Sequence, residues 1–244
     1  MQKVGRSKKR FCGDAGERLR QGEGVMFERI IEIHDPAPHS AALNMAIDEV
    51  LLAGAREPLL RLYRWERPAA SFGYFGKYAA IAPVWPGREL VRRMTGGGVV
   101  PHGDDLTYSL IVPGEHAISQ YNPRDIYRAV HEAIAAMLAA SGVASAFAAA
   151  RDENGSGLCF ESPAEFDLLA GDRKVAGAAM RRTRDGLLLQ GSIQHLPALD
   201  LVVSKMPAAF GAKTGGRGIE PSEFHDANSL AVSKYATREW TERV

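Results

Sequence analysis

The chain has 244 residues, 45% of them apolar and 24% charged, with a formal net charge of +1. This length and composition fit one globular core, and the lack of an apolar run of about 18 to 20 residues excludes a membrane-spanning protein. No signal peptide begins the chain, so we expect a cytoplasmic protein with no membrane contact. The two cysteines, Cys12 and Cys159, are too far apart to indicate a disulfide framework or a zinc site, and we expect no metal.

The N-terminal segment is basic. Residues 1–24 carry seven basic and three acidic side chains and show almost no apolar periodicity. Such a segment predicts a disordered extension, which we place at residues 1–25, ahead of a single domain at residues 26–244. A nucleic-acid-binding tail is the alternative interpretation, but the rest of the chain is mildly acidic, which argues against a nucleic-acid partner.

The first half of the domain is predicted to contain one helix and several strands. Alternating β-branched residues predict a strand at 27–33, and the spacing of Leu43, Ile47 and Leu51 predicts a helix that begins near Ser40. Short strand-like segments bounded by Pro and Gly follow at 59–65, 69–75, 89–94 and 106–113.

The second half adds a well-marked helix and more strands. Asn122 can cap a helix with Pro123 in its first position, and Gly142 is a suitable end. Strands are predicted at 165–170, 173–180 and 187–194, the last two joined by an Asp185-Gly186 hairpin, with a mobile glycine-rich loop at 211–218 and a helix at 222–243. The fold class predicted is α+β, with a mixed central sheet flanked by helices.

The segment RRMTGGGVVPHGDD, residues 92–105, places three consecutive glycines between an arginine pair and a histidine. Glycine has no Cβ, so such a loop can approach a ligand closely and direct its N–H groups at a phosphate or carboxylate. The arginines can add fixed positive charge, although a purely structural turn also fits the glycines. The candidate binding residues are Arg92, Arg93, Gly96, Gly97, Gly98 and His102.

A second cluster lies at residues 171–194. Lys174 begins a predicted strand whose next residues, 175–179, are small. A lysine beside a small-residue strand suits a narrow tunnel for an apolar chain with a polar head, because the lysine can bind the head. Close packing of the strand against a helix, with a surface lysine, is the alternative.

Together the two segments resemble the lipoate and octanoate attachment superfamily, which includes lipoate-protein ligases, octanoyltransferases and, more distantly, biotin-protein ligases. The motifs are RRMTGGGVVPH and, further along, DRKVAGAAMRRTRDGLLLQGS, and ALNMAIDEVLL resembles the family's first helix. The resemblance covers about residues 27–205. It implies a fold like the catalytic domains of class II aminoacyl-tRNA synthetases and biotin-protein ligases.

The resemblance also implies roles for the residues. The family's glycine loop falls on residues 92–102, which would line the pocket for the acyl group and its activated head. Its essential lysine falls on Lys174, which would contact the carbonyl head or an α-phosphate, and Gly177 and Ala178 would belong to the small-residue wall.

The segment GLCFESPAEFDLLAGDRKVAG resembles the cysteine-type octanoyltransferases, in which a Cys-Phe pair precedes an Asp-containing strand and the lysine. This resemblance implies that Cys159 is the nucleophile and that Lys174 favours its thiolate and stabilises the developing oxyanion. Asp167 becomes a candidate for orienting the donor or the incoming lysine. A buried bystander thiol is the alternative for Cys159.

Two chemistries remain open. A transferase receives its octanoyl group as a thioester and needs no cofactor, whereas a ligase uses ATP and Mg²⁺ to activate free lipoate or octanoate. The chain ends soon after the motifs, without room for the extra C-terminal domain of many lipoate ligases, which favours the transferase. Gly98 instead matches the ligase pattern RRxxGGGxVxH, and Pro101 and Gly103 depart from both patterns. We favour the transferase and keep the ATP-dependent ligase as the alternative.

Either enzyme would act on a lipoyl-domain acceptor, namely the glycine cleavage H protein or the E2 subunit of a 2-oxoacid dehydrogenase. Acyl carrier protein would be the octanoyl donor of the transferase. A noncatalytic acyl-binding protein and a biotin-protein ligase are further alternatives, but the sequence lacks the GRGRxGR-like loop that biotin ligases carry.

Overall fold

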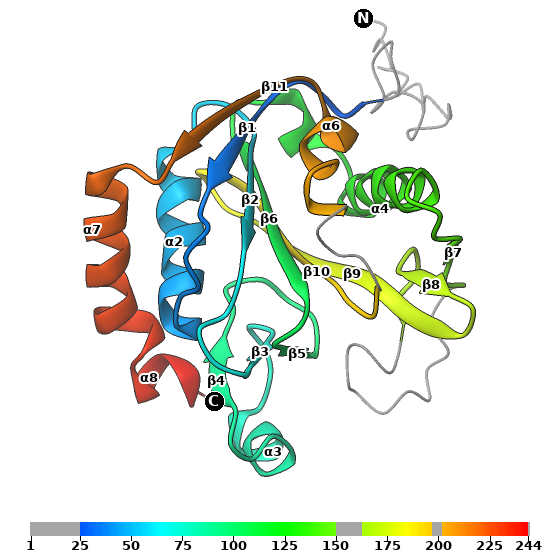
Figure 1. The fold of residues 1–244 in the computed structure, drawn as a ribbon. Helices are drawn as coiled ribbons and strands as arrows, with labels where there is room; N and C mark the ends of the chain where they lie inside the picture. Colours follow the sequence, from blue (N-terminus) through cyan, green and yellow to red (C-terminus); the bar gives the residue numbers. More distant parts are fainter. Residues whose placement is uncertain (1–24, 150–162, 197–201, 244) are drawn as a thin grey trace, which may run out of the picture.

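The computed structural model describes residues 25–149, 163–196 and 202–243 (Figure 1). The strands are β1 (Phe27–His34), β2 (Leu59–Tyr63), β3 (Ala69–Phe72), β4 (Glu89–Arg92), β5 (Val99–His102), β6 (Leu106–Pro113), β7 (Ala146–Phe147), β8 (Leu168–Ala170), β9 (Arg173–Arg182), β10 (Gly186–Ile193) and β11 (Gly211–Gly218). The helices are α2 (Ala41–Gly54), α3 (Tyr78–Ile81), α4 (Pro123–Ala139), α6 (Met206–Phe210), α7 (Pro221–Leu230) and α8 (Arg238–Thr241), with short helical turns η1 (Ala82–Val84), η2 (Ala117–Gln120) and η3 (Ala231–Tyr235).

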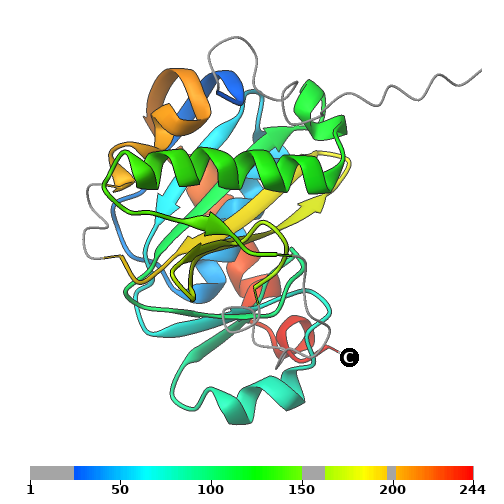
Figure 2. The same cartoon turned by 90° about the vertical axis from the view of Figure 1, so that its right-hand side faces the viewer.

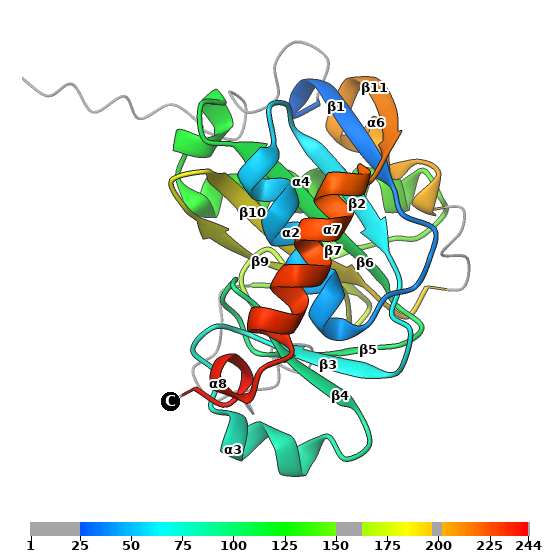
Figure 3. The same ribbon diagram turned by 90° about the vertical axis from the view of Figure 1, so that its left-hand side faces the viewer.

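Eight strands form a mixed sheet in the order β11-β1-β2-β6-β10-β9-β8-β7, in which β1 is parallel to both of its neighbours and the other pairs are antiparallel. A second sheet has the order β4-β3-β5. Helices α4 and α6 cover one face of the large sheet (Figure 2), and α2 and α7 cover the opposite face (Figure 3). The predicted α+β class with a mixed central sheet flanked by helices is confirmed.

Local signals place the two main helices where the sequence predicts them. The Ser40 hydroxyl caps α2 by accepting a hydrogen bond from the Leu43 N–H at 3.3 Å. The Asn122 side chain caps α4 by accepting from the Arg124 N–H at 2.9 Å, and Pro123 occupies the first helical position. Each cap satisfies an N–H group that has no partner within the helix.

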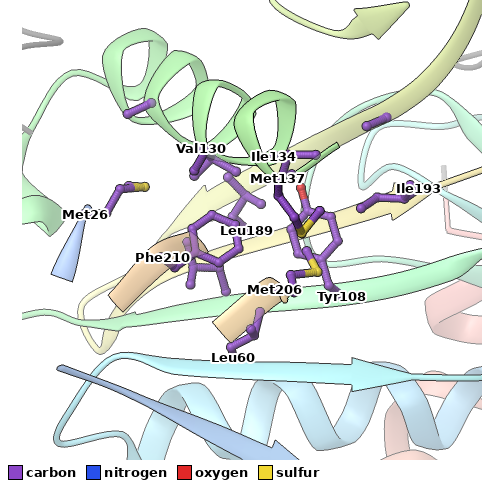
Figure 4. Packing of buried hydrophobic residues seen from close by; sticks show 14 of the residues in the cluster. Met26, Leu60, Tyr108, Val130, Ile134, Met137, Leu189, Ile193, Met206 and Phe210 are labelled. Atoms are coloured by element: carbon purple, nitrogen blue, oxygen red, sulfur yellow. The ribbon is translucent and has the colours of Figure 1, made fainter. Parts of the chain in front are cut away.

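Two apolar cores hold the helices on the sheet. On the α4 side, Val130, Ile134 and Met137 pack with Leu189 of β10 and Phe210 of α6 (Figure 4). The other core joins α2 to the opposite face of the sheet and to the C-terminal helices. Truncating a core side chain such as Ile134, which is fully buried, to alanine should cost about 2 to 5 kcal/mol. No helix in the described ranges is both long enough and apolar enough to cross a membrane.

The predicted hairpin is present, since Asp185 and Gly186 connect β9 to β10 and Gly186 has φ of +152°. The predicted C-terminal helix is also present, as α7, η3 and α8 with a break after Tyr235. The expectation of a mobile loop at 211–218 is wrong, because this segment is β11, which pairs in parallel with β1. A Cβ on Gly216 would lie 2.2 Å from Nε2 of His34, so its glycine permits close strand contact rather than mobility.

Candidate active site

A narrow cleft opens between the large sheet and the three-stranded sheet. The space between its walls is about 420 Å³ when the part open to solvent is included. The residues that line it are Met45, Tyr63, Trp65, Ser71, Arg93, Val100, His102, Thr107, Lys174, Gly177, Ala178, Ala179, Gln190, Gly191 and Ser192. The structure therefore brings Arg93, His102, Lys174, Gly177 and Ala178 of the predicted site together.

The glycine loop connects β4 to β5 and is held by Arg93. The Arg93 guanidinium donates to the carbonyl oxygens of Gly96 and Gly98, each at 3.0 Å, and to Oγ of Ser71 at 2.7 Å. Gly97 has φ of +86°, a conformation that favours glycine. The positive charge of Arg93 thus fixes the shape of the loop from inside the cleft wall.

Arg92 is not brought into the cleft. Its guanidinium is buried and donates to carbonyl oxygens at 2.7 to 2.9 Å, in Tyr74, Gly76, Trp240, Thr241 and Arg243. It therefore ties the C-terminal helix α8 to the three-stranded sheet. The interpretation of Arg92 as a substrate-binding residue is corrected to a structural one, because its donors are taken up by these five carbonyl groups.

Lys174 and Asp167 form a buried ion pair at the cleft wall, with 2.6 Å between Nζ and Oδ2. Asp167 also accepts from the Ala164 N–H at 2.6 Å and from the Tyr127 hydroxyl. Burial, followed by the charge of Asp167, raises the pKa of the Tyr127 hydroxyl far above its ordinary value, so that it stays a donor. Asp167 thus holds Lys174 in place, and its expected role in orienting the donor or the incoming lysine stays a prediction.

Gly177 makes room for the head of Lys174. A Cβ at this position would lie 2.5 Å from Cε and 2.7 Å from Nζ of Lys174. The small residues of β9 therefore serve two purposes, since they accommodate the lysine and leave the cleft open beside it. Lys174 is buried, so the alternative of a surface lysine is wrong, and the tunnel for an apolar chain stays a prediction.

His102 is buried at the opposite wall and has partners on both ring nitrogens. Nε2 lies 2.6 Å from Oγ of Ser71 and Nδ1 lies 2.8 Å from Oδ2 of Asp105. The ring stacks on Trp65 with 4.0 Å between centroids. Neither Ser71 nor Asp105 was identified from the sequence. The only signal for Asp105 was its place in the pair of aspartates after His102, and Ser71 had none.

Asp105 is held as a carboxylate by its surroundings. Burial alone would raise its pKa, but the contacts with His102, the hydroxyl of Ser192 and the N–H of Gly103 outweigh burial and lower the pKa to about 2. The Ser192 hydroxyl donates to Oδ2 at 2.6 Å. Asp105 is therefore a permanent negative charge behind His102 at neutral pH.

A polar network closes the floor of the cleft. Gln190 of β10 accepts from the Thr95 hydroxyl at 2.8 Å and donates to Asp48 of α2 at 2.7 Å. Asp48 in turn pairs with the fully buried Arg61 at 2.7 Å. A buried network of this kind is rigid when every member is satisfied, so the floor is fixed to α2.

Four further residues are not among the described residues that line the cleft. Cys159, the expected nucleophile, lies outside the described residues. His195 is exposed and has φ of +62°. Lys213 and Arg217 lie on the edge strand β11, where they pair with Glu28 at 3.3 Å and Glu223 at 2.7 Å.

Comparison with known proteins agrees with this arrangement. The family described as the lipoyl protein ligase A/B catalytic domain matches residues 40–223. Octanoyltransferase LipM of Oceanobacillus iheyensis is 38% identical over 165 residues, which are 64% of this chain and 60% of that protein. Octanoyltransferase LipM of Moorella thermoacetica is 36% identical over 179 residues, which are 68% of this chain and 66% of that protein. The chain thus spans less than two thirds of the length of these relatives.

A solved structure shares the fold. Lipoate-protein ligase A bound with ATP superposes with a TM-score of 0.64 at 21% sequence identity, covering 89% of this chain and 99% of that one. The matched residues include both motif segments, namely the glycine loop and the strand β9 that contains Lys174. The chain belongs to the lipoyl protein ligase A/B catalytic domain family.

Proposed function

We propose that this chain transfers an octanoyl group from octanoyl-acyl carrier protein to a lysine of a lipoyl-domain protein, through a thioester on Cys159. The observation that carries the proposal is the buried amino group of Lys174 in the wall of a narrow cleft, beside the small residues Gly177, Ala178 and Ala179. The similarity to proteins named octanoyltransferase LipM supports it.

The reaction has two steps. In the first, the sulfur of Cys159 attacks the carbonyl carbon of the donor thioester, the carrier's C–S bond breaks, and the departing thiolate takes the thiol proton. In the second, the neutral amine of the acceptor lysine attacks the new thioester, a C–N bond forms, the bond to Cys159 breaks, and the departing thiolate takes one amine proton. The second step is downhill because an amide is more stable than a thioester, so this route uses no cofactor.

The described residues would act on the carbonyl group. The positive charge of Lys174, fixed by Asp167, is placed to stabilise negative charge that develops on the carbonyl oxygen. Gly177 and Ala178 leave space beside the lysine for the acyl chain. Gly96, Gly97 and Gly98 would lie against the activated head, on a loop whose shape Arg93 holds.

The acceptor in this proposal is a lipoyl domain, either the glycine cleavage H protein or an E2 subunit, and the donor is acyl carrier protein. A cytoplasmic location stays a prediction from the sequence.

An ATP-dependent lipoate-protein ligase is the second candidate. Gly98, the third glycine of the loop, matches the ligase pattern, and the fold is shared with a lipoate-protein ligase A bound with ATP. In that case Lys174 would contact the α-phosphate of an acyl-adenylate, and ATP with Mg²⁺ would supply the activation that the thioester supplies in the transferase.

Intact mass separates the two candidates. The protein is mixed with octanoyl-acyl carrier protein without ATP, beside a Cys159→Ala variant. An octanoyl adduct that is absent from the variant and passes to a lipoyl domain supports the transferase. Acceptor modification that requires ATP and free lipoate or octanoate, with no adduct, supports the ligase and makes Cys159 a packing residue.

A further inference from the structure

The two oxygens of the Asp167 carboxylate have different partners. Oδ2 contacts Nζ of Lys174 at 2.6 Å and accepts from the N–H of Ala164, also at 2.6 Å. Oδ1 accepts from the hydroxyl of Tyr127, which belongs to α4. The side chains of Asp167 and Lys174 are 1% and 3% exposed, so the protein, and not the solvent, orients this carboxylate.

The partners of Tyr127 determine the direction of its hydrogen bonds. The N–H of Ala178 can only donate, and it donates to the Tyr127 hydroxyl oxygen at 3.1 Å. The single hydroxyl hydrogen is therefore directed at Oδ1 of Asp167. Tyr127 thus receives a hydrogen bond from the strand that carries Lys174 and gives one to the carboxylate that holds Lys174.

The N–H of Ala178 is available because the neighbouring strand ends before it. The strands β8 and β9 pair only as far as Leu168 and Ala176, and Ala178 lies two residues further along β9. The Tyr127 hydroxyl accepts where a carbonyl group of a longer β8 would accept. A buried N–H group needs such a partner, so this edge of β9 fixes the position of the hydroxyl.

The Tyr127 side chain is also held from within its own helix. The ring of His131, one turn further along α4, lies 4.3 Å from the Tyr127 ring between centroids. Burial lowers the pKa of His131 to about 4, so its ring is neutral at neutral pH. A carbonyl group can only accept, so Nδ1 of His131 donates to the Tyr127 carbonyl oxygen at 2.9 Å. The hydroxyl is therefore presented by a rigid element.

Tyr127 links the cleft to the opposite face of the large sheet. The helix α4 covers one face (Figure 2) and α2 covers the other (Figure 3), whereas Met45 of α2 and Lys174 both line the cleft. Without the hydroxyl, Oδ1 would lose this donor, and the carboxylate could rotate about its Cβ–Cγ bond, whose torsion is broad. Both oxygens could then approach the amino group, which would be drawn towards Asp167 and away from the cleft.

We propose that Tyr127 is a positioning residue, which holds Asp167 in the orientation that places Nζ of Lys174 at the acyl carbonyl group. Tyr127 touches no substrate and acts through Asp167. The inference rests on the proposed function in one respect, namely that Lys174 acts at the carbonyl group. It holds whether Lys174 stabilises charge there or accepts a proton there, because both depend on where Nζ lies.

The test compares two buried tyrosine hydroxyls. The Tyr127→Phe substitution removes the donor to Asp167 and keeps the ring that packs on His131. The matched control is Tyr108→Phe, because the Tyr108 hydroxyl has no hydrogen-bond partner among the described residues. Burial, followed by the charge of Asp167, raises the pKa of Tyr108 as well, so both hydroxyls lie in the field of the same carboxylate.

Octanoyl transfer from octanoyl-acyl carrier protein to a lipoyl domain is followed by intact mass, with thermal unfolding as the check on folding. We expect Tyr127→Phe to lower kcat by about 10- to 100-fold, because a small displacement of a reacting group is costly. The KM for each protein should stay within about twofold of the wild type, since Tyr127 contacts neither of them. Tyr108→Phe should keep the wild-type kcat and KM.

A second measurement reports on Lys174 without any substrate. The protein is labelled with carbon-13 at Cε of lysine, and the NMR signal of Lys174 is assigned by its absence from a Lys174→Arg variant. We expect this signal to move in Tyr127→Phe and to stay in place in Tyr108→Phe. A general loosening of the fold would also move the signals of distant lysines such as Lys213 in β11.

The proposal requires both changes, in kcat and in the Lys174 signal, and either one without the other overturns it. Equal losses of kcat in the two phenylalanine variants, or a raised KM with an unchanged kcat, also overturn it. If the wild type forms no thioester on Cys159, the transferase proposal fails, and kcat is then compared with ATP and free octanoate as substrates. The NMR comparison depends on neither activity, so an unmoved Lys174 signal overturns the positioning role in every case.

Discussion

A Cβ atom on Gly177 would lie 2.7 Å from Nζ of Lys174, so the bare backbone of one residue sets the position of the other's amino group. The pair lies in the cleft wall, where Asp167 holds the lysine at 2.6 Å, and Oδ1 of Asp167 would lie 2.9 Å from the same Cβ. The position of this positive charge can therefore be changed without changing the lysine itself.

Replacing Gly177 by alanine should lower the rate of octanoyl transfer by about 10- to 100-fold, because the methyl group displaces the Lys174 head from the carbonyl it serves. The matched control is Gly218→Ala, another strand glycine, where an added Cβ meets nothing within 4 Å. Transfer to a lipoyl domain is measured by mass, with thermal unfolding as the check on folding. Equal rates for the two variants would contradict the role assigned to Gly177.

The Asp167→Asn substitution should destabilise the protein by about 3 kcal/mol, because it removes the negative charge that faces a buried lysine. The Glu28→Gln substitution breaks an ion pair with Lys213 whose side chains are 87% and 72% exposed, and it should cost less than about 1 kcal/mol. Urea unfolding of both variants beside the wild type gives the comparison. Equal losses would mean that the buried pair contributes no more than a surface pair.

The stability contributed by Asp105 should depend on pH. Its pKa in the folded protein is about 2 against an ordinary 3.8, so the folded state favours the carboxylate. A depressed pKa stabilises the fold above the ordinary value, here by about 2 kcal/mol, and this contribution is lost as the pH falls from about 4 towards 2. The difference in unfolding free energy between the wild type and Asp105→Asn should shrink by about 1 kcal/mol between pH 6 and pH 3, measured in urea. A difference that does not change with pH would show that Asp105 is not held as a carboxylate.

Replacing Arg92 by lysine should loosen the C-terminal helix. A lysine has three donors on a flexible stem and cannot serve five carbonyl groups. Amide hydrogen exchange in residues 238–243 should become faster, while octanoyl transfer stays within about threefold of the wild type. Arg238→Lys, an exposed position that pairs with Glu242 at 2.9 Å, is the control and should leave exchange unchanged. A large loss of octanoyl transfer in the Arg92→Lys variant would instead indicate that Arg92 takes part in substrate binding.

The sequence correctly predicts the elements whose ends are determined by nearby residues in the chain. The caps at Ser40 and Asn122 and the Asp185-Gly186 turn act over a few residues, so α2, α4 and the β9–β10 hairpin were all predicted. That the glycine loop and Lys174 belong to one site was predicted only from the family resemblance. The two segments are far apart in the sequence, and no local pattern connects them.

What the sequence did not predict depends on distant partners. Strand alternation allows one of two adjacent arginines to face inward, yet both Arg92 and Arg93 are buried, because the C-terminal helix covers the outer side of the small sheet. The strand nature of 211–218 was missed because its glycines, which read as a loop, fit against side chains of β1. Ser71 is 31 positions from His102 in sequence, so no local pattern could associate them.

The glycine loop packs directly against the end of β3, without room for a side chain between them. A Cβ on Gly73, which follows β3, would lie 2.0 Å from the carbonyl oxygen of Gly97, so the loop fits only against a neighbour with no side chain. The loop is consequently not a portable motif. Residues 92–102 transplanted into another scaffold would not adopt this loop conformation unless β3, with the glycine that follows it, were transplanted as well.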